Sequence, residues 1–176
     1  MANRLKPGRP KKAKPDGLDY GPVFRQIRVA ELLGWDYWVE GERVRYQAPA
    51  GFEEKDAPWL AQTELGRLYA RGTIGEDAYR AGRGFQAACW RAFGAPFARA
   101  IDYTKLPDGG GYEEMEAGAA QRFVVKAKRH VQDRAGLEGK QMIERLCQYD
   151  QAVPVEDVVG RVTLDAAMGA LVRFMG

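Results

Sequence analysis

The chain has 176 residues, of which 45% are hydrophobic and 11% aromatic, and its net charge is +3. This length suits one domain, or a small domain with an appendage, and the apolar fraction is sufficient for a buried core. No run of about 18 apolar residues is present, so we expect no transmembrane helix and no membrane partner. The basic N-terminus lacks the apolar stretch of a secretory signal peptide. Because Cys89 and Cys147 lie in predicted helices without CxxC spacing, we expect buried, reduced thiols in a cytoplasmic protein.

The excess positive charge lies at the N-terminus. Residues 1–16 hold six lysines and arginines against Asp16, a net charge of +5, so the remaining residues carry −2. Three prolines, one glycine and few apolar side chains predict a tail that is disordered when free. A basic tail on a mildly acidic body favours an anionic partner.

The residues after the tail predict one helix and one hairpin. Apolar side chains follow helical spacing over 22–34, with Gly34 as a stop. Aromatic and β-branched residues flank Gly41 in the stretch 35–47, which predicts a β-hairpin with its turn at Gly41-Glu42. Residues 48–58 are predicted to form a linker or an ordered loop.

From residue 59 onward the pattern is helical. Helices are predicted over 59–71 and 75–93, ending at Gly72 and Gly94, and, after a break at 104–111, near 113–135, 137–149, 154–160 and 163–175. The predicted fold class is therefore mainly α, a small helical bundle with one short β-hairpin near residues 35–47 and a disordered basic N-terminal tail. The expected domains are a tail over 1–17, a helix-plus-hairpin element over 18–58 and a helical domain over 59–176.

The tail contains the stretch KPGRPKKAKP, in which Gly8, Arg9 and Pro10 resemble the core of an AT-hook. Glycine without a side chain and proline with its fixed φ keep such a backbone flat, so that arginine enters an A·T minor groove. Pro7 stands where the motif has a further arginine, which leaves base preference open, and the alternative is a non-specific electrostatic tail. We predict contact with double-stranded DNA through the tail cations, defined as Arg4, Lys6, Arg9, Lys11, Lys12 and Lys14.

A second candidate DNA contact lies on the helix near 113–135. At about 100° per residue, its apolar residues share one face, and Arg122, Lys126 and Arg129 share another. This basic face suits a phosphate backbone or an acidic protein surface. The alternative is the ordinary solvent side of an amphipathic helix.

Two groups of residues are candidates for protein contact. The hairpin offers rigid aromatic side chains of the kind that dominate interfaces, unless some of them fill the core: Trp35, Tyr37, Trp38 and Tyr46. The helix over 75–93 carries an arginine stripe of Arg80, Arg83 and Arg91 beside Gly84 and Ala87, which suits a partner or an intramolecular helix contact. Its opposite face, with Tyr79, Cys89 and Phe93, is predicted to lie in the core.

The C-terminal residues suggest a helix-turn-helix. Pro154 opens the first helix, the turn falls at Gly160-Arg161, and Thr163 is the candidate N-cap of the second. That second helix is apolar nearly all round, which suits docking in a core better than reading bases.

Catalytic motifs are missing from the sequence. It has a single histidine and no GxSxG, GxGxxG or P-loop pattern. We therefore expect no enzymatic activity, no cofactor, no metal and no small-molecule substrate.

Two patterns in the last two thirds of the chain are similar to a known family. They are a Gly-x-Ile…Tyr-x-Ala-Gly-x-x-Phe step and a closing apolar helix, here Gly72, Ile74, Tyr79, Ala81, Gly82 and Phe85, then Leu164, Ala167, Met168, Leu171 and Gly176. Over about 64–176 the chain resembles a helical domain of unknown function from alphaproteobacteria and their phages, found in the C-terminal part of the gene-transfer-agent transcription activator. The resemblance implies a phage- or mobile-element-type transcription regulator in a bacterial cell, whose helical domain contacts host RNA polymerase while a separate part contacts DNA.

The N-terminal part leaves alternatives open. Before residue 59 the chain holds only the tail, a helix and a hairpin, and the last two are a candidate minimal winged element. Two other classes of function are a phage assembly or DNA-packaging protein and an inhibitor that binds the surface of a host protein.

Overall fold

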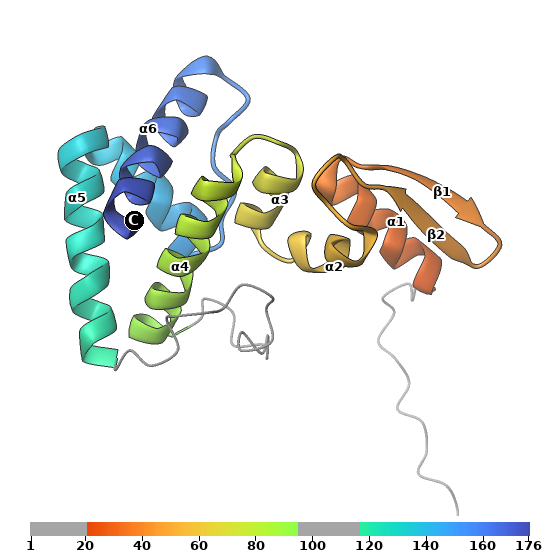
Figure 1. The fold of residues 1–176 in the computed structure, drawn as a ribbon, viewed down its shortest axis with the longest axis horizontal. Coiled ribbons are helices and arrows are strands. Elements are labelled where there is room, and N and C mark those ends of the chain that lie inside the picture. The colour runs from red at the N-terminus through yellow and green to blue at the C-terminus, as the bar shows by residue number, and fades with distance from the viewer. Residues whose placement is uncertain (1–20, 95–116) are drawn as a thin grey trace, which may run out of the picture.

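A computed structural model describes residues 21–94 and 117–176 (Figure 1). Over these residues the chain is mainly helical with one two-stranded antiparallel hairpin, which confirms the predicted fold class. The tail cations and the predicted break at 104–111 lie outside the described residues. None of the described helices is long and apolar enough to cross a membrane.

The N-terminal element consists of α1 (Pro22–Leu33) and the hairpin. Helix α1 ends at Gly34, whose φ of 67° is left-handed, as glycine readily allows. Strand β1 (Asp36–Glu40) pairs with β2 (Arg43–Gln47) across a two-residue loop that begins with Gly41. The hairpin and α1 share a first hydrophobic cluster with residues between 57 and 70: Ala30, Leu33, Trp35, Val44, Tyr46, Ala57, Leu60, Ala61 and Ala70.

The predicted helix over 59–71 is two short helices, α2 (Ala57–Leu60) and α3 (Glu64–Ala70). The break arises because the Thr63 hydroxyl accepts a hydrogen bond from the Gly66 amide at 3.1 Å and so caps a new helix. A Cβ at Gly66 would lie 2.3 Å from the Leu60 carbonyl oxygen, so only glycine permits this tight turn.

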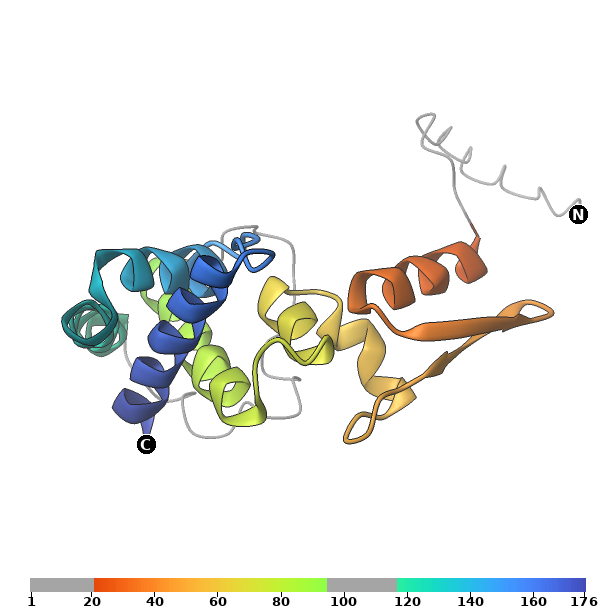
Figure 2. The same ribbon diagram turned by 90° about the horizontal axis from the view of Figure 1, so that it is seen from above.

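The second, larger cluster lies among α4 (Glu76–Phe93), α5 (Ala117–Ile143) and α6 (Val158–Met175). Figures 1 and 2 show these three helices together at one end, the α1–hairpin element at the other, and α2 and α3 between them. The rings of Tyr69 and Tyr79 stack with centroids 4.4 Å apart and pack against both clusters, which joins the two halves.

Helix α5 bends at Gly136, where φ is 74° and ψ is −178°, close to the predicted boundary between 113–135 and 137–149. Such a conformation is essentially restricted to glycine. After Ile143 the chain continues into a π-helical turn, Glu144–Gln148.

The predicted helix-turn-helix at the C-terminus is wrong, because α6 is one helix that runs through Gly160-Arg161. The Asp157 side chain caps it by accepting a hydrogen bond from the Gly160 amide at 2.5 Å. Thr163 is inside the helix, where its hydroxyl donates to the Val159 carbonyl at 2.8 Å. Pro154 precedes the helix. Its carbonyl oxygen packs against Gly160 so closely that a Cβ on residue 160 would lie 2.1 Å from it.

Candidate nucleic-acid interface

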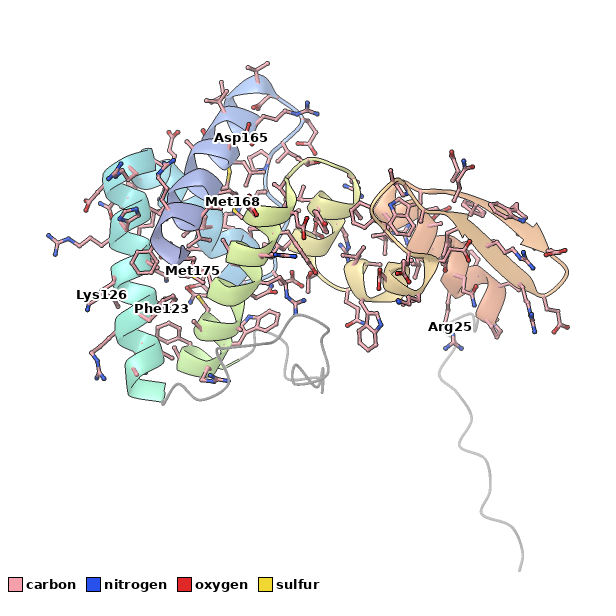
Figure 3. All side chains as sticks on the ribbon, in the orientation of Figure 1. Arg25, Phe123, Lys126, Asp165, Met168 and Met175 are labelled. Carbon is pink, nitrogen blue, oxygen red and sulfur yellow. The ribbon has the colours of Figure 1, made fainter. Side chains whose placement is uncertain are left out.

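Helix α5 is divided into a buried and a basic face, as its sequence predicts. Ala120, Val124, Ala127 and Val131 are fully buried, and Phe123 packs against Phe174 with ring centroids 5.3 Å apart. The exposed side holds Arg122, Lys126 and Arg129, here called the α5 basic row. Figure 3 shows Phe123 and Lys126 pointing to opposite sides of the helix. The buried face fixes the rotation of α5 and thereby directs the row to solvent.

The α5 basic row carries charge that the rest of the described chain leaves unneutralised. None of its three cations forms an ion pair with a carboxylate of residues 21–94 or 117–176. Arg122 and Arg129 are seven residues apart, which corresponds to about 10 Å along the helix axis. Since duplex DNA carries one charge per about 1.7 Å of axis, a row of this length can contact more than one phosphate.

Lys128 is not part of the α5 basic row, although it lies between Lys126 and Arg129 in the sequence. Its ammonium forms an ion pair with Glu144 at 2.9 Å and donates to the Gln148 side chain at 2.5 Å, both on the π-helical turn. Phe93, predicted to lie in the core, is instead 53% exposed at the last residue of α4, with its ring centroid 5.9 Å from this ammonium. Lys128 therefore joins α5 to the π-helical turn and is not available to a phosphate.

The hairpin aromatics do not form one contact surface, which corrects the prediction for Trp35 and Tyr46. Both are buried, at 5% and 6% exposure. The Trp35 indole donates to the Ala70 carbonyl at 3.1 Å, and the Tyr46 hydroxyl donates to the Gln26 carbonyl at 3.2 Å. Their apolar bodies fill the first cluster, and internal hydrogen bonds satisfy their polar ends.

Tyr37 and Trp38 remain candidates for partner contact, since they are 39% and 47% exposed. Trp38 lies opposite Arg45 in the strand register. Arg45 also forms an ion pair with Glu40 at 3.1 Å. The exposed indole is thus held on a hairpin face with ordered charges beside it.

The arginine stripe on α4 is only partly exposed. Arg80 is exposed and pairs with Glu76 at 2.5 Å, whereas Arg83 and Arg91 are half-buried. Gly84, which lies beside the stripe, is buried, because α4 packs in the larger cluster there. The intramolecular alternative therefore fits Arg83 and Arg91 better than an open partner surface.

The two cysteines are buried and free, as predicted. Burial raises the pKa of the Cys89 thiol to about 12 and also raises the pKa of the Cys147 thiol. Both thiols are therefore protonated at neutral pH and unreactive. Within the described residues no three His, Cys, Asp or Glu side chains are arranged to hold a metal ion.

A surface pocket of about 270 Å³ combines residues that the sequence analysis did not single out. Its lining comes from the loop after α3 and from α6: Arg71, Gly72, Thr73, Arg161, Leu164 and Asp165. No local spacing relates these two segments in the sequence, so only the fold brings them together.

Comparison of the chain with protein-family models, with curated proteins and with solved structures gave no match. The resemblance to the helical domain of the gene-transfer-agent activator therefore rests on its residues alone and stays a prediction.

Proposed function

We propose that the protein is a phage- or mobile-element-type transcription regulator that contacts double-stranded DNA and the host RNA polymerase. The observation that supports DNA contact is the α5 basic row, three exposed cations without a described carboxylate partner on a helix whose other face is buried. The six tail cations are the larger group and are proposed to contribute most of the affinity, with the row assisting them. Both groups act on phosphates, and Arg9 in its Gly-Arg-Pro step is the candidate for minor-groove insertion.

Replacement of the α5 basic row by alanine tests this contact. The matched control removes three cations that already have carboxylate partners, Arg28, Arg45 and Lys55. DNA affinity is measured against salt concentration for both variants. Each lost phosphate contact lowers the slope of log affinity against log salt by about 0.9, so the row variant loses more slope than the control. Equal slopes in the two variants would remove α5 from the interface.

Contact with RNA polymerase is proposed through the helical domain, assisted by the exposed hairpin aromatics. Trp38→Ala is the informative variant, because tryptophan is enriched among interface hot spots, whose replacement costs about 2 kcal/mol or more, equal to roughly 30-fold in affinity. Phe24→Ala is its control, since Phe24 on α1 lies outside both the hairpin and the helical domain and is similarly exposed, at 44% against 47%. Binding to purified bacterial RNA polymerase should fall for Trp38→Ala only. An equal effect of both variants would argue against the hairpin as the contact.

A phage assembly or DNA-packaging role is the second candidate function. It is favoured by three exposed valines on the first turns of α6, Val158, Val159 and Val162, at 77%, 70% and 61% exposure. Exposed apolar groups of this kind favour association of copies. A defined higher oligomer in light scattering would support assembly, and a monomer would support the regulator. Polymerase binding without DNA binding would instead favour an inhibitor of a host protein.

A further inference from the structure

The pocket between the α3–α4 loop and α6 contains no residue of the α5 basic row and none of the exposed hairpin aromatics. Arg71 and Thr73 line one wall, and Arg161 and Asp165 line the other. Figure 3 labels Asp165 on the part of α6 next to that loop. Leu164, which is 1% exposed, provides an apolar surface between the walls.

Both guanidinium groups are held by the backbone of neighbouring segments. One terminal nitrogen of Arg71 donates to the Leu32 carbonyl at 2.6 Å. The Nε of Arg161 donates to the Val155 carbonyl at 2.9 Å. A guanidinium has five N–H donors in a fixed plane, so each arginine keeps further donors for a ligand. Because these hydrogen bonds already orient the side chains, less conformational entropy is lost when a ligand binds.

The charges of the pocket are not balanced within it. Two arginines face one carboxylate, and Asp165 forms no ion pair with either of them in the described structure. The pocket therefore has a net positive charge, together with one acceptor at Asp165 and a hydroxyl at Thr73. Arg-lined sites of this kind match the oxygens of phosphate and carboxylate groups.

We propose that this pocket binds a small organic anion, with its phosphate or carboxylate group between Arg71 and Arg161 and a hydroxyl group that donates to Asp165. The volume of about 270 Å³ is near the lower end for ligand pockets, which suits a small molecule. Arg71 also donates to the Leu32 carbonyl at the end of α1, so one arginine of the pocket joins the helical domain to the N-terminal element. The chain then responds to an anionic metabolite as a ligand, although no substrate was expected from its sequence.

The test uses the full chain with glycerol phosphate and glycerate as hydroxyl-bearing anions, inorganic phosphate as the bare anion and glycerol as the uncharged match. Calorimetry and thermal melting measure binding. We expect at least one of the hydroxyl-bearing anions to bind saturably and to raise the melting temperature, whereas glycerol does neither. If only glycerol phosphate binds, the acidic group is a phosphate, and if only glycerate binds, it is a carboxylate. Failure of both hydroxyl-bearing anions to bind would overturn the proposal.

Variants separate a built site from general charge. Arg161→Ala should weaken the anion that binds by about tenfold or more, because it removes charge-assisted hydrogen bonds. Arg173→Ala, an exposed arginine on the same helix outside the pocket, is the control and should bind normally. Since Arg161 also holds a carbonyl, Arg71→Ala provides an independent variant from the other wall. Equal losses for the pocket variants and the control would contradict the site.

Asp165→Asn tests the role of the carboxylate. It removes the repulsion of the anion and the strong acceptor for the ligand's hydroxyl. We expect inorganic phosphate to gain affinity relative to the hydroxyl-bearing anion, and an unchanged ratio would overturn the assigned orientation. DNA affinity of Arg161→Ala should remain that of the unmodified chain, so failure of this site and failure of DNA binding are distinguishable.

Discussion

At the scale of single residues, Asp150 combines an unusual backbone conformation with a hydrogen bond between two segments. It is the only non-glycine residue with positive φ, 50°, in the described part of the chain. Its Oδ1 accepts a hydrogen bond from the Glu64 amide at 2.9 Å, which joins the chain after the π-helical turn to the start of α3. Burial raises the pKa of its carboxyl above the usual 3.8, although the hydrogen bond from Glu64 acts in the opposite direction.

This raised pKa predicts a pH dependence of stability. As pH rises from 3.8 through the raised pKa, the folded chain still holds a proton that the unfolded chain has released. The contribution of Asp150 to the free energy of unfolding therefore falls with rising pH and is recovered on acidification. Asp150→Asn keeps an oxygen acceptor and tolerates positive φ, so it should lose this slope without loss of stability at neutral pH. Denaturant unfolding at several pH values measures the difference, and identical pH profiles would show that Asp150 does not cause it.

Asp150→Ala is the contrasting variant. It removes the acceptor of the Glu64 amide and places alanine at positive φ. We expect a loss of about 2 kcal/mol in the free energy of unfolding at neutral pH. A loss as small as that of the asparagine variant would mean that the hydrogen bond contributes little.

Lys128 and Lys126 form a second contrast at the residue scale. Lys128 is 17% exposed and paired with Glu144, whereas Lys126 is fully on the solvent side of α5. Lys128→Ala leaves the Glu144 carboxylate poorly solvated and should cost about 1–3 kcal/mol. Lys126→Ala should change stability by less than about 0.5 kcal/mol. Urea unfolding of the two variants tests whether Lys128 is a structural residue. Equal losses in the free energy of unfolding would show that it is not.

At the scale of elements, α6 depends on Gly160, where the sequence predicts a turn but the helix is continuous. A Cβ at Gly160 would meet the Pro154 carbonyl oxygen at 2.1 Å, but at Gly169 it would meet only the tip of Arg173 at 3.8 Å. Gly160→Ala should therefore destabilise the protein by about 2 kcal/mol or more. Gly169→Ala should stabilise it by about 0.5–1 kcal/mol, because alanine is the better helix former. Thermal unfolding compares them, and a harmless Gly160→Ala would show that the loop before α6 is free to move away.

Glycines explain which element boundaries the sequence could predict. Gly34, Gly72, Gly94 and Gly136 have positive φ in the structure, and each lies at a predicted boundary. At positions 66 and 160, glycine is required for a different reason, because a backbone carbonyl lies where a Cβ would be. The two uses of glycine are alike in a sequence, which therefore predicts one helix where α2 and α3 are separate and two helices where α6 is continuous.

At the scale of the whole molecule, predictability depends on whether a feature is local. The α5 basic row follows from helical spacing within one segment, and its exposure agrees with that expectation. The burial of Trp35 depends on α3, where it donates to the Ala70 carbonyl, and that of Tyr46 depends on α1, where it donates to the Gln26 carbonyl. The anion pocket depends on segments near residues 71–73 and 161–165. Tertiary contacts of this kind have no periodic signal in the sequence.

The central claim is that the chain contacts DNA by charge, with the tail cations as the main contributors. The measurement that tests it most directly is DNA affinity against salt concentration for the full chain and for a chain that begins at Leu18, on A·T-rich and G·C-rich duplexes. The account predicts binding with a steep salt dependence that is reduced by about 0.9 in slope for each tail cation that contacts a phosphate. A preference for A·T-rich DNA would add minor-groove insertion at Arg9. The same affinity and slope for both chains, or no binding by either at physiological salt, would contradict it.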